Sequence, residues 1–229
     1  MDHPIFTESI QRIQALLGPT GLPLLEQEVL ERLIHSSGDP ALAPLLRFTP
    51  RACTTAALAL AQGAVILTDT AMAAAAVLPM AARTFSNPVH SVLQWAPPVA
   101  PDGQTRAALG MSAALQFHPG AVVLIGSAPT ALELLLDRVA QGAPAPALVI
   151  GMPVGFVGVA DSKSRLAASG LPQIRLEGSR GGAGRRRVRR GGIPCADRRI
   201  RARNAAPLHA LAASRHPLPD PPGGEPHGD

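Results

Sequence analysis

The stretch Ala121-Val122-Val123-Leu124-Ile125-Gly126-Ser127-Ala128-Pro129-Thr130-Ala131-Leu132 decides the fold class. It runs from five consecutive apolar residues into a glycine and then into a segment with a helical pattern. Apolar runs without alternation are typical of strands in a parallel sheet that is covered on both faces. Two further runs have this form, residues 64–67 before Asp69 and residues 147–150 before Gly151. Together they predict an α/β layered domain with a mainly parallel sheet flanked by helices.

Periodicity and stop signals predict the helices around this sheet. Near the start of the chain, apolar residues with a 4-3-4 spacing line one face of a helix that begins around residues 7–8. These residues are Phe6, Ile10, Ile13 and Leu17. A second helix is predicted over residues 24–35, with a stop at Gly38-Asp39-Pro40. Its expected outward-facing residues are Glu26, Glu28, Glu31 and Arg32. Further helices are predicted at residues 50–62 and 130–141.

Length and composition restrict the classes of function. The 229 residues suffice for one full domain or two small ones, and 46% of them are hydrophobic. Only 3% are aromatic and tyrosine is absent, which argues against aromatic stacking platforms for single-stranded nucleic acid. The net charge of +5 belongs to the end of the chain, because residues 1–183 hold 11 basic and 12 acidic side chains whereas residues 184–229 hold 10 and 4. We therefore expect no nucleic-acid partner for the globular part.

Past residue 182 the sequence loses its apolar period and becomes rich in arginine, glycine and proline. We predict a domain over residues 1–182 and a tail over residues 183–229 that is either disordered or the product of a shifted reading frame. The residues that fill this tail are those encoded by GC-rich codons, which motivates the second alternative. If the tail is instead the true sequence, the core lacks one helix.

Cysteine usage and hydropathy indicate a cytoplasmic protein with no membrane association. Cys53 and Cys195 are the two cysteines, and they show neither a disulfide framework nor zinc-ligand spacing. The first residues have no basic and apolar regions of the kind that signal peptides carry. The uncharged run over residues 139–160 contains three prolines and four glycines, so we interpret it as buried strand and loop.

His35 is the candidate for acid chemistry. It lies in the last turn of its predicted helix, where the carbonyl partial charges favour a cation, and Asp39 follows within reach. Both effects predict a raised pKa, and a histidine protonated near neutral pH can act as a general acid. The plainer alternative is a histidine that caps the helix end by binding a carbonyl.

Other candidates lie where strands are predicted to end. Ser127 or Thr130 can cap a helix whose free N–H groups face an anion, or the loop is a plain helix start. Asp69 is either a ligand contact or a loop cap. The glycines of residues 151–158, Gly155 among them, imply close approach of the backbone to a ligand or to a neighbouring strand.

Two basic residues complete the set. A lone Lys163 after a strand is usually solvated. Arg106 either clamps a carboxylate or is an ordinary surface arginine. Hydrolase and metalloenzyme motifs are absent from the sequence, and no metal site is predicted.

Five segments in order resemble the precorrin-8X methylmutases of corrin-ring synthesis. They are residues 33–39 (LIHSSGD), 66–72 (ILTDTAM), 105–108 (TRAA), 126–132 (GSAPTAL) and 151–163 (GMPVGFVGVADSK). The resemblance covers roughly residues 6–182. It implies an isomerase that moves a methyl group from C-11 to C-12 of the macrocycle by a 1,5-sigmatropic shift, on precorrin-8X or the cobalt-bearing equivalent, with no cofactor.

The resemblance also implies site residues and an assembly. The family's catalytic histidine falls on His35, and substrate contacts fall on Ser9 and Arg106. The tetrapyrrole substrate is a polycarboxylate, so an arginine and helix N-terminal amides are its expected partners. On this basis Asp69, Ser127, Thr130, Gly155 and Lys163 are substrate-binding candidates. The family is a homodimer with its sites near the subunit interface.

Two alternatives from another class of function stay open at this point. One is a corrinoid-binding protein without turnover. The other is a nucleic-acid binder that uses the arginine-rich residues 185–203.

Overall fold

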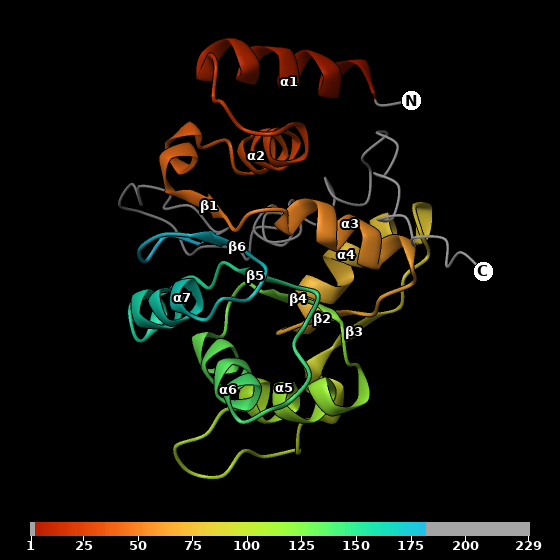
Figure 1. Cartoon of the computed structure of the whole chain (residues 1–229), viewed down its shortest axis with the longest axis vertical. Helices are drawn as coiled ribbons and strands as arrows, with labels where there is room; N and C mark the ends of the chain where they lie inside the picture. Colours follow the sequence, from red (N-terminus) through yellow and green to blue (C-terminus); the bar gives the residue numbers. More distant parts are fainter. Residues whose placement is uncertain (1–2, 182–229) are drawn as a thin grey trace, which may run out of the picture.

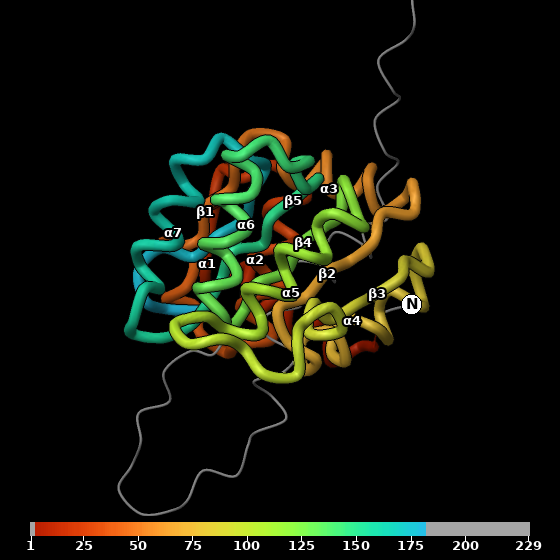
Figure 2. The backbone as a smooth tube through the Cα atoms, turned by 90° about the horizontal axis from the view of Figure 1, so that it is seen from below, coloured from red at the N-terminus to blue at the C-terminus, as the bar shows by residue number. Residues whose placement is uncertain are grey.

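A six-stranded sheet forms the centre of the molecule. The structure, a computed structural model, describes residues 3–181. The strand order is β1-β6-β5-β4-β2-β3 (Figure 1). Seen from below, β5, β4, β2 and β3 follow one another in the same order (Figure 2). Five strands are parallel, and β1 pairs with β6 in the antiparallel direction. The strands are β1 Leu46–Phe48, β2 Ile66–Thr68, β3 Val89–Ser91, β4 Val122–Ile125, β5 Leu148–Gly151 and β6 Gln173–Leu176.

Helices cover both faces of this sheet (Figure 1). One face carries α1 Pro4–Leu17, α2 Leu24–Ser37, α3 Ala52–Ala61 and α4 Ala71–Arg83. The other carries α5 Arg106–Phe117, α6 Pro129–Ala140 and α7 Val159–Ala168. Two short 3-10 helices, η1 Pro40–Leu45 and η2 Val92–Trp95, precede β1 and follow β3.

Alternate residues of the central strands face the two helical layers. Val122 and Leu124 of β4 pack with α1–α4, whereas Val123 and Ile125 pack with α5–α7. All four are fully buried, as a doubly covered parallel sheet requires. The predicted α/β fold is confirmed, and the three apolar runs form β2, β4 and β5.

The helix predictions are confirmed with small differences in their bounds. The first helix begins at Pro4, since His3 caps it by accepting a hydrogen bond from the Ile5 N–H. The second extends to Ser37 and ends at Gly38, whose φ of +63° is the left-handed cap that the glycine predicts. The run over residues 139–160 contains β5 and its loops. No helix in the described range is both long and apolar enough to span a membrane.

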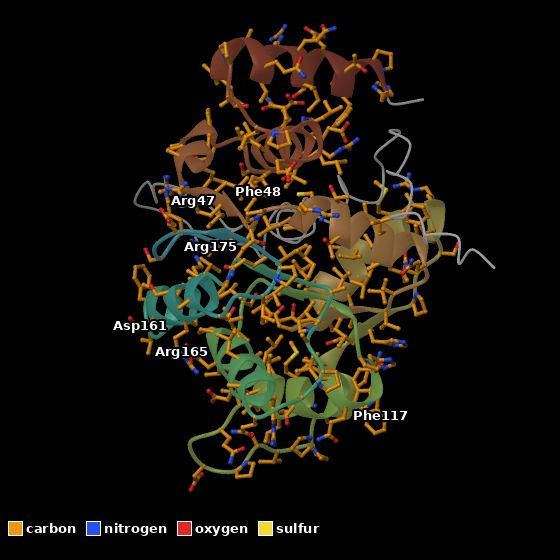
Figure 3. All side chains as sticks on the ribbon, in the orientation of Figure 1. Arg47, Phe48, Phe117, Asp161, Arg165 and Arg175 are labelled. Atoms are coloured by element: carbon orange, nitrogen blue, oxygen red, sulfur yellow. The ribbon has the colours of Figure 1, made fainter. Side chains whose placement is uncertain are left out.

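One expectation for α2 is wrong. Glu26 and Glu31 are buried at 7% and 4% exposure, because α1 and neighbouring segments cover that face. Glu31 keeps its hydrogen bonds there, accepting from the Gln14 and Gln27 side-chain amides at 2.9 and 2.6 Å. Two arginines lie opposite each other in the antiparallel pair, Arg47 of β1 and Arg175 of β6 (Figure 3). The Glu177 carboxylate lies 2.8 Å from the guanidinium of Arg47 and 3.9 Å from that of Arg175.

The predicted division at residue 182 stays a prediction. The tail, its Cys195 and its arginines lie outside the described residues.

Candidate active site

The carboxyl ends of the parallel strands and the end of α2 meet at one edge of the sheet. The segments after β2, β4, β5 and β6 leave the sheet at this edge, as parallel pairing requires. Because β1 is antiparallel, its first residue Leu46 pairs with Leu176 at the same edge. The turn from α2 through η1 into β1 therefore reaches the edge where ligands bind in open α/β sheets.

His35 presents its imidazole at the surface near the end of α2. Its Nδ1 shares a 2.7 Å hydrogen bond with the Ser9 hydroxyl of α1, and the donor depends on the ring tautomer. The Phe6 ring meets the imidazole edge-on at 4.9 Å between centroids, and the Arg32 guanidinium covers Phe6 at 4.8 Å. Within residues 3–181, Nε2 of His35 has no hydrogen-bond partner.

The electrostatics of His35 differ from the prediction. Partial burial, followed by the positive charge of Arg32, lowers the pKa of His35 below its ordinary value. The prediction of a raised pKa is wrong, because burial and the charge of Arg32 disfavour the imidazolium, while the Asp39 carboxylate accepts from the Ala41 N–H and pairs with Arg180. The alternative, in which the ring caps the helix by binding a carbonyl, is also wrong, because the hydrogen bond of the imidazole is to the Ser9 hydroxyl.

Asp69 organises the loop that follows β4. Its Oδ2 accepts hydrogen bonds from the N–H groups of Gly126, Ser127 and Ala128 at 3.1, 2.6 and 2.8 Å. The carboxyl group is fully buried, which raises its pKa, while those three N–H groups oppose the rise. Of the two alternatives for Asp69, the geometry is that of a loop cap. The amides predicted to face an anion are thus already bound to a carboxylate of the chain.

The N-termini of α5 and α6 are tied to each other. The Thr105 and Thr130 hydroxyls share a 2.7 Å hydrogen bond, and Thr105 also caps α5 by accepting from the Ala108 N–H. Arg106 is exposed and donates through Nε to the carbonyl of Pro97 at 2.8 Å. Arg106, Ser127 and Thr130 thus lie on the α5–α7 side of the sheet.

The first glycine of the segment 151–158, Gly151, is the last residue of β5 and lies between two neighbouring strands, opposite Ile125 of β4 and Arg175 of β6. A Cβ on Gly151 would collide with Cδ2 of Leu166, so the glycine lets α7 pack onto the strand. Further along, Gly155 is half-buried, while Phe156 and Val157 are 83% and 88% exposed. Two large apolar side chains are therefore mostly exposed beside the strand ends.

Lys163 is buried rather than solvated, which corrects the expectation for it. It is 2% exposed on α7, and its ammonium donates to the carbonyls of Gly178 and Arg180 at 2.9 and 2.5 Å. Burial lowers its pKa to about 8.

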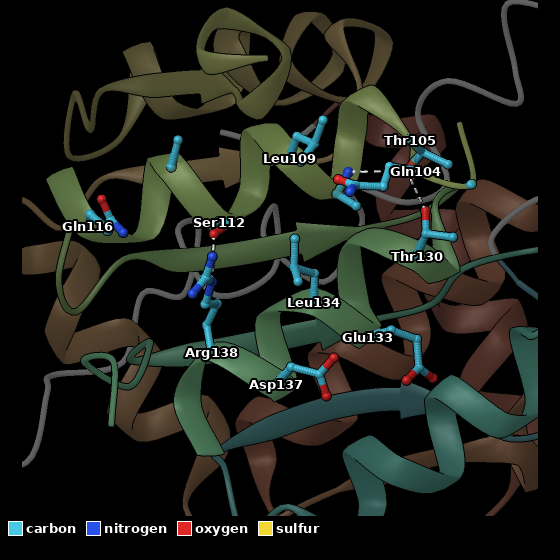
Figure 4. A pocket seen from close by; sticks show the side chains of 13 residues that line it. Gln104, Thr105, Leu109, Ser112, Gln116, Thr130, Glu133, Leu134, Asp137 and Arg138 are labelled. Carbon is cyan, nitrogen blue, oxygen red and sulfur yellow. Dashed lines mark hydrogen bonds between the residues drawn. The ribbon is translucent and has the colours of Figure 1, made fainter. Parts of the chain in front are cut away.

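The structure thus divides the candidates between the two faces of the sheet. His35 and Ser9 touch each other on the α1–α4 side, and Ser127 is bound to the loop cap Asp69 on the other. A cavity of about 560 Å³ lies between α5 and α6 (Figure 4). Thr130 lines it together with Thr105 and Arg138, whereas His35 does not. The described residues contain no group of three or more side chains arranged to hold a metal ion.

Comparison with known proteins identifies the family. A family model described as Precorrin-8X methylmutase matches residues 4–185. The chain belongs to the precorrin-8X methylmutase family. Enzymes of this family catalyse an intramolecular methyl migration in cobalamin biosynthesis, so the prediction of an isomerase of this type is confirmed.

Individual methylmutases are similar over most of their length. The precorrin-8X methylmutase of Pseudomonas aeruginosa is 39% identical over 186 residues, which are 78% of this chain and 88% of the relative. The cobalt-precorrin-8 methylmutase of a Synechocystis strain is 36% identical over 197 residues, covering 80% and 90%. The crystal structure of the Thermus thermophilus precorrin-8X methylmutase superposes with a TM-score of 0.74 at 34% identity, covering 92% of this chain and 96% of that one.

Sequence reasoning missed three residues at the candidate site. The spacing placed Phe6 and Arg32 only on helix faces, although Phe6 packs against the imidazole of His35 and Arg32 covers the Phe6 ring. Arg180 lies within residues 6–182, which the resemblance covers, but only its pairing with Asp39 gives it a role. The glycines around Arg180 in Gly178-Ser179-Arg180-Gly181 were the available signal.

Proposed function

We propose that this chain moves the methyl group from C-11 to C-12 of precorrin-8X, or of its cobalt-bearing equivalent, and that His35 acts on the ring. The observation that carries the proposal is the exposed imidazole, with Nδ1 bound to Ser9 and Nε2 without a partner in the described part of the chain. A macrocycle that approaches this surface meets Nε2 first.

The lowered pKa favours a hydrogen-bonding role over full protonation. At neutral pH the free imidazole is mainly neutral, because its pKa lies below the ordinary value near 6.5. If the Ser9 hydroxyl donates to Nδ1, the ring proton resides on Nε2. Nε2–H then donates to the conjugated ring system and draws electron density from it, so the migrating methyl meets a more electrophilic C-12. The C-11 bond breaks as the C-12 bond forms, and no cofactor takes part.

The polycarboxylate rim of the substrate needs cations or N–H donors. We propose Arg106 as one of them, because its terminal guanidinium nitrogens make no hydrogen bond to the residues that the structure describes. Ser127, Thr130 and Gly155 stay proposed contacts at the same strand edge. For Asp69 and Lys163, which are buried and bound to backbone, an indirect role through the loops they hold is better supported.

We propose that two copies of the chain complete the site. In a single chain His35 and Phe156 are exposed, and the cavity between α5 and α6 lies on the other side of the sheet. A reaction on a large ring benefits from exclusion of water, which a second copy over this edge would provide. Sedimentation should give about twice the chain mass of 23.6 kDa, and activity per chain should fall on dilution. Full activity in the monomer would contradict the dimer proposal.

We also propose a cytoplasmic location, supported by the buried free thiol of Cys53.

The decisive experiment is incubation of the enzyme with each form of the substrate, with and without oxygen, followed by a visible spectrum of the bound pigment. His35→Ala should lower the rate of rearrangement by roughly 10²- to 10⁴-fold and leave pigment binding largely intact. His118→Ala is the matched control, since this half-buried histidine lies on α5's end, outside the proposed site.

Two outcomes oppose the proposal. Equal turnover in His35→Ala and the parent would remove His35 from the reaction. A parent that binds the pigment without changing its spectrum would instead favour the corrinoid-binding alternative.

A further inference from the structure

The segment after β6, residues 177–181, is held from α7 by a buried charge. The Lys163 ammonium donates to two of its carbonyls, those of Gly178 and Arg180. A charge that is 2% exposed needs such partners, because an unpaired buried ammonium is costly. The backbone at residues 178–180 is therefore fixed relative to α7.

The same segment lies directly against the loop after β5. A Cβ placed on Gly181 would come within 2.6 Å of the Val154 Cβ and 2.7 Å of the Met152 carbonyl oxygen. Only glycine fits this approach, so the segment cannot move toward that loop. Lys163 and Gly181 together set the point from which the Arg180 side chain extends.

From that point Arg180 reaches the turn that ends α2. Its two terminal nitrogens lie 3.4 Å from Oδ2 of Asp39 and 3.2 Å from the carbonyl oxygen of Ala41. Asp39 is itself bound into the turn, accepting from the Ala41 N–H and donating its own N–H to the Ser37 hydroxyl. The Arg180 guanidinium thus connects the segment after β6 to the end of α2, the helix that carries His35.

The other support of His35 is weaker. It consists of Ser9 and Phe6 on α1, a helix whose one buried residue is Ile13. Asp39 lies two residues beyond Ser37, the last residue of α2, and the N–H of the intervening Gly38 still donates to the Ile34 carbonyl. A shift of this turn therefore acts on the end of the helix that carries the imidazole. A misplacement of about 1 Å can cost a reaction roughly 100-fold.

We infer that Arg180 is a positioning residue, which holds His35 in register with the strand edge through Asp39, and that Lys163 holds Arg180. Neither residue touches the substrate in this assignment. The inference rests on the role proposed for His35.

The test compares Arg180→Gln with Arg180→Lys in the full chain. Arg180→Gln should lower kcat by roughly 10- to 100-fold with little change in KM, and Arg180→Lys should restore part of the loss. Asp39→Asn should lower kcat by a similar factor. Combining Asp39→Asn with Arg180→Gln should lower kcat little further, because both changes break the same contact. Arg165→Gln is the matched control, since Arg165 pairs with Glu133 and Asp137 on the opposite face.

A second readout does not depend on turnover. The imidazole resonances of His35, assigned with His35→Gln, should shift in Arg180→Gln, and its pKa should rise because the Asp39 carboxylate is released from its pair. Arg165→Gln should leave both unchanged.

The two proposals fail in different ways. Unchanged kcat together with unchanged His35 resonances in Arg180→Gln would overturn the positioning role. An inactive parent whose His35 resonances still respond to Arg180→Gln would overturn the proposed reaction and support the positioning contact.

Discussion

Asp69 shows what one buried carboxyl group does for the loop after β4. It fixes three consecutive N–H groups, and its second oxygen, Oδ1, is buried with no partner among residues 3–181. Burial disfavours the charged form and raises the pKa of Asp69, whereas the three N–H donors favour that form and oppose the rise.

We predict different costs for two substitutions of this residue. Asp69→Ala should lower the free energy of unfolding by about 3 kcal/mol, because it leaves buried donors unpaired. Asp69→Asn should cost clearly less, since its side-chain oxygen can accept the same hydrogen bonds and it carries no charge. Urea denaturation measures both, with exposed Asp102→Ala expected to stay within about 0.5 kcal/mol of the parent. An Asn variant as unstable as the Ala variant would show that Asp69 is ionised.

At the scale of elements, three segments meet in an aromatic cluster. His90 of β3 stacks on His118 at the end of α5 with 5.6 Å between centroids. Trp95 of η2 meets both rings edge-on, at 5.6 Å from His90 and 5.2 Å from His118. Desolvation, followed by repulsion from His90, lowers the pKa of His118.

This cluster predicts a pH-dependent signal from the chain's one tryptophan. Trp95 fluorescence should fall on acidification at a pH below the ordinary histidine value near 6.5, as His118 becomes a quenching imidazolium. The folded chain binds this proton less readily than the unfolded chain, so the same acidification lowers the free energy of unfolding. In His90→Gln the fluorescence midpoint should move upward, because the repulsion is gone. An unchanged midpoint in His90→Gln would show that the fluorescence change does not arise from the stacked pair of His90 and His118.

The elements differ in how well the sequence predicts them. Continuous apolar runs predicted β2, β4 and β5, because a strand covered on both faces must be apolar throughout. The antiparallel pair β1 and β6 contains Arg47 and Arg175, whose charges are balanced by Glu177 beside them. Nothing local distinguishes such strands from loops. The alanine-rich α4 has no polar face to reveal its period.

At the scale of the molecule, the site depends on contacts between residues far apart in sequence. The Ser9–His35 pair was reached through the family resemblance, and its hydrogen bond joins helices that composition alone could not orient. The tie between Arg180 and Asp39 spans most of the chain. The burial of Lys163 could not be predicted either, because its partners are backbone carbonyls, which every sequence has.

Charge is also unevenly distributed over the whole molecule. Residues 1–183 are nearly neutral, with 11 basic and 12 acidic side chains, whereas residues 184–229 carry 10 basic and 4 acidic ones. A polycarboxylate substrate is attracted by such a concentration of positive charge when salt is low. At about 0.15 M ionic strength the field is screened beyond roughly 8 Å.

Replacing the five arginines of residues 185–190 by serine should therefore change the rate of substrate association and not the rate of the chemical step. At low ionic strength kcat/KM should fall several-fold relative to the parent, whereas kcat should stay within about twofold, because no residue of the proposed site is altered. Near 0.15 M salt the kcat/KM values of the variant and the parent should converge. A loss of kcat that persists at high salt would place these arginines in the reaction itself. Salt-sensitive binding of unrelated DNA by the parent, abolished in the variant and accompanied by no methyl migration in either, would support the nucleic-acid alternative instead.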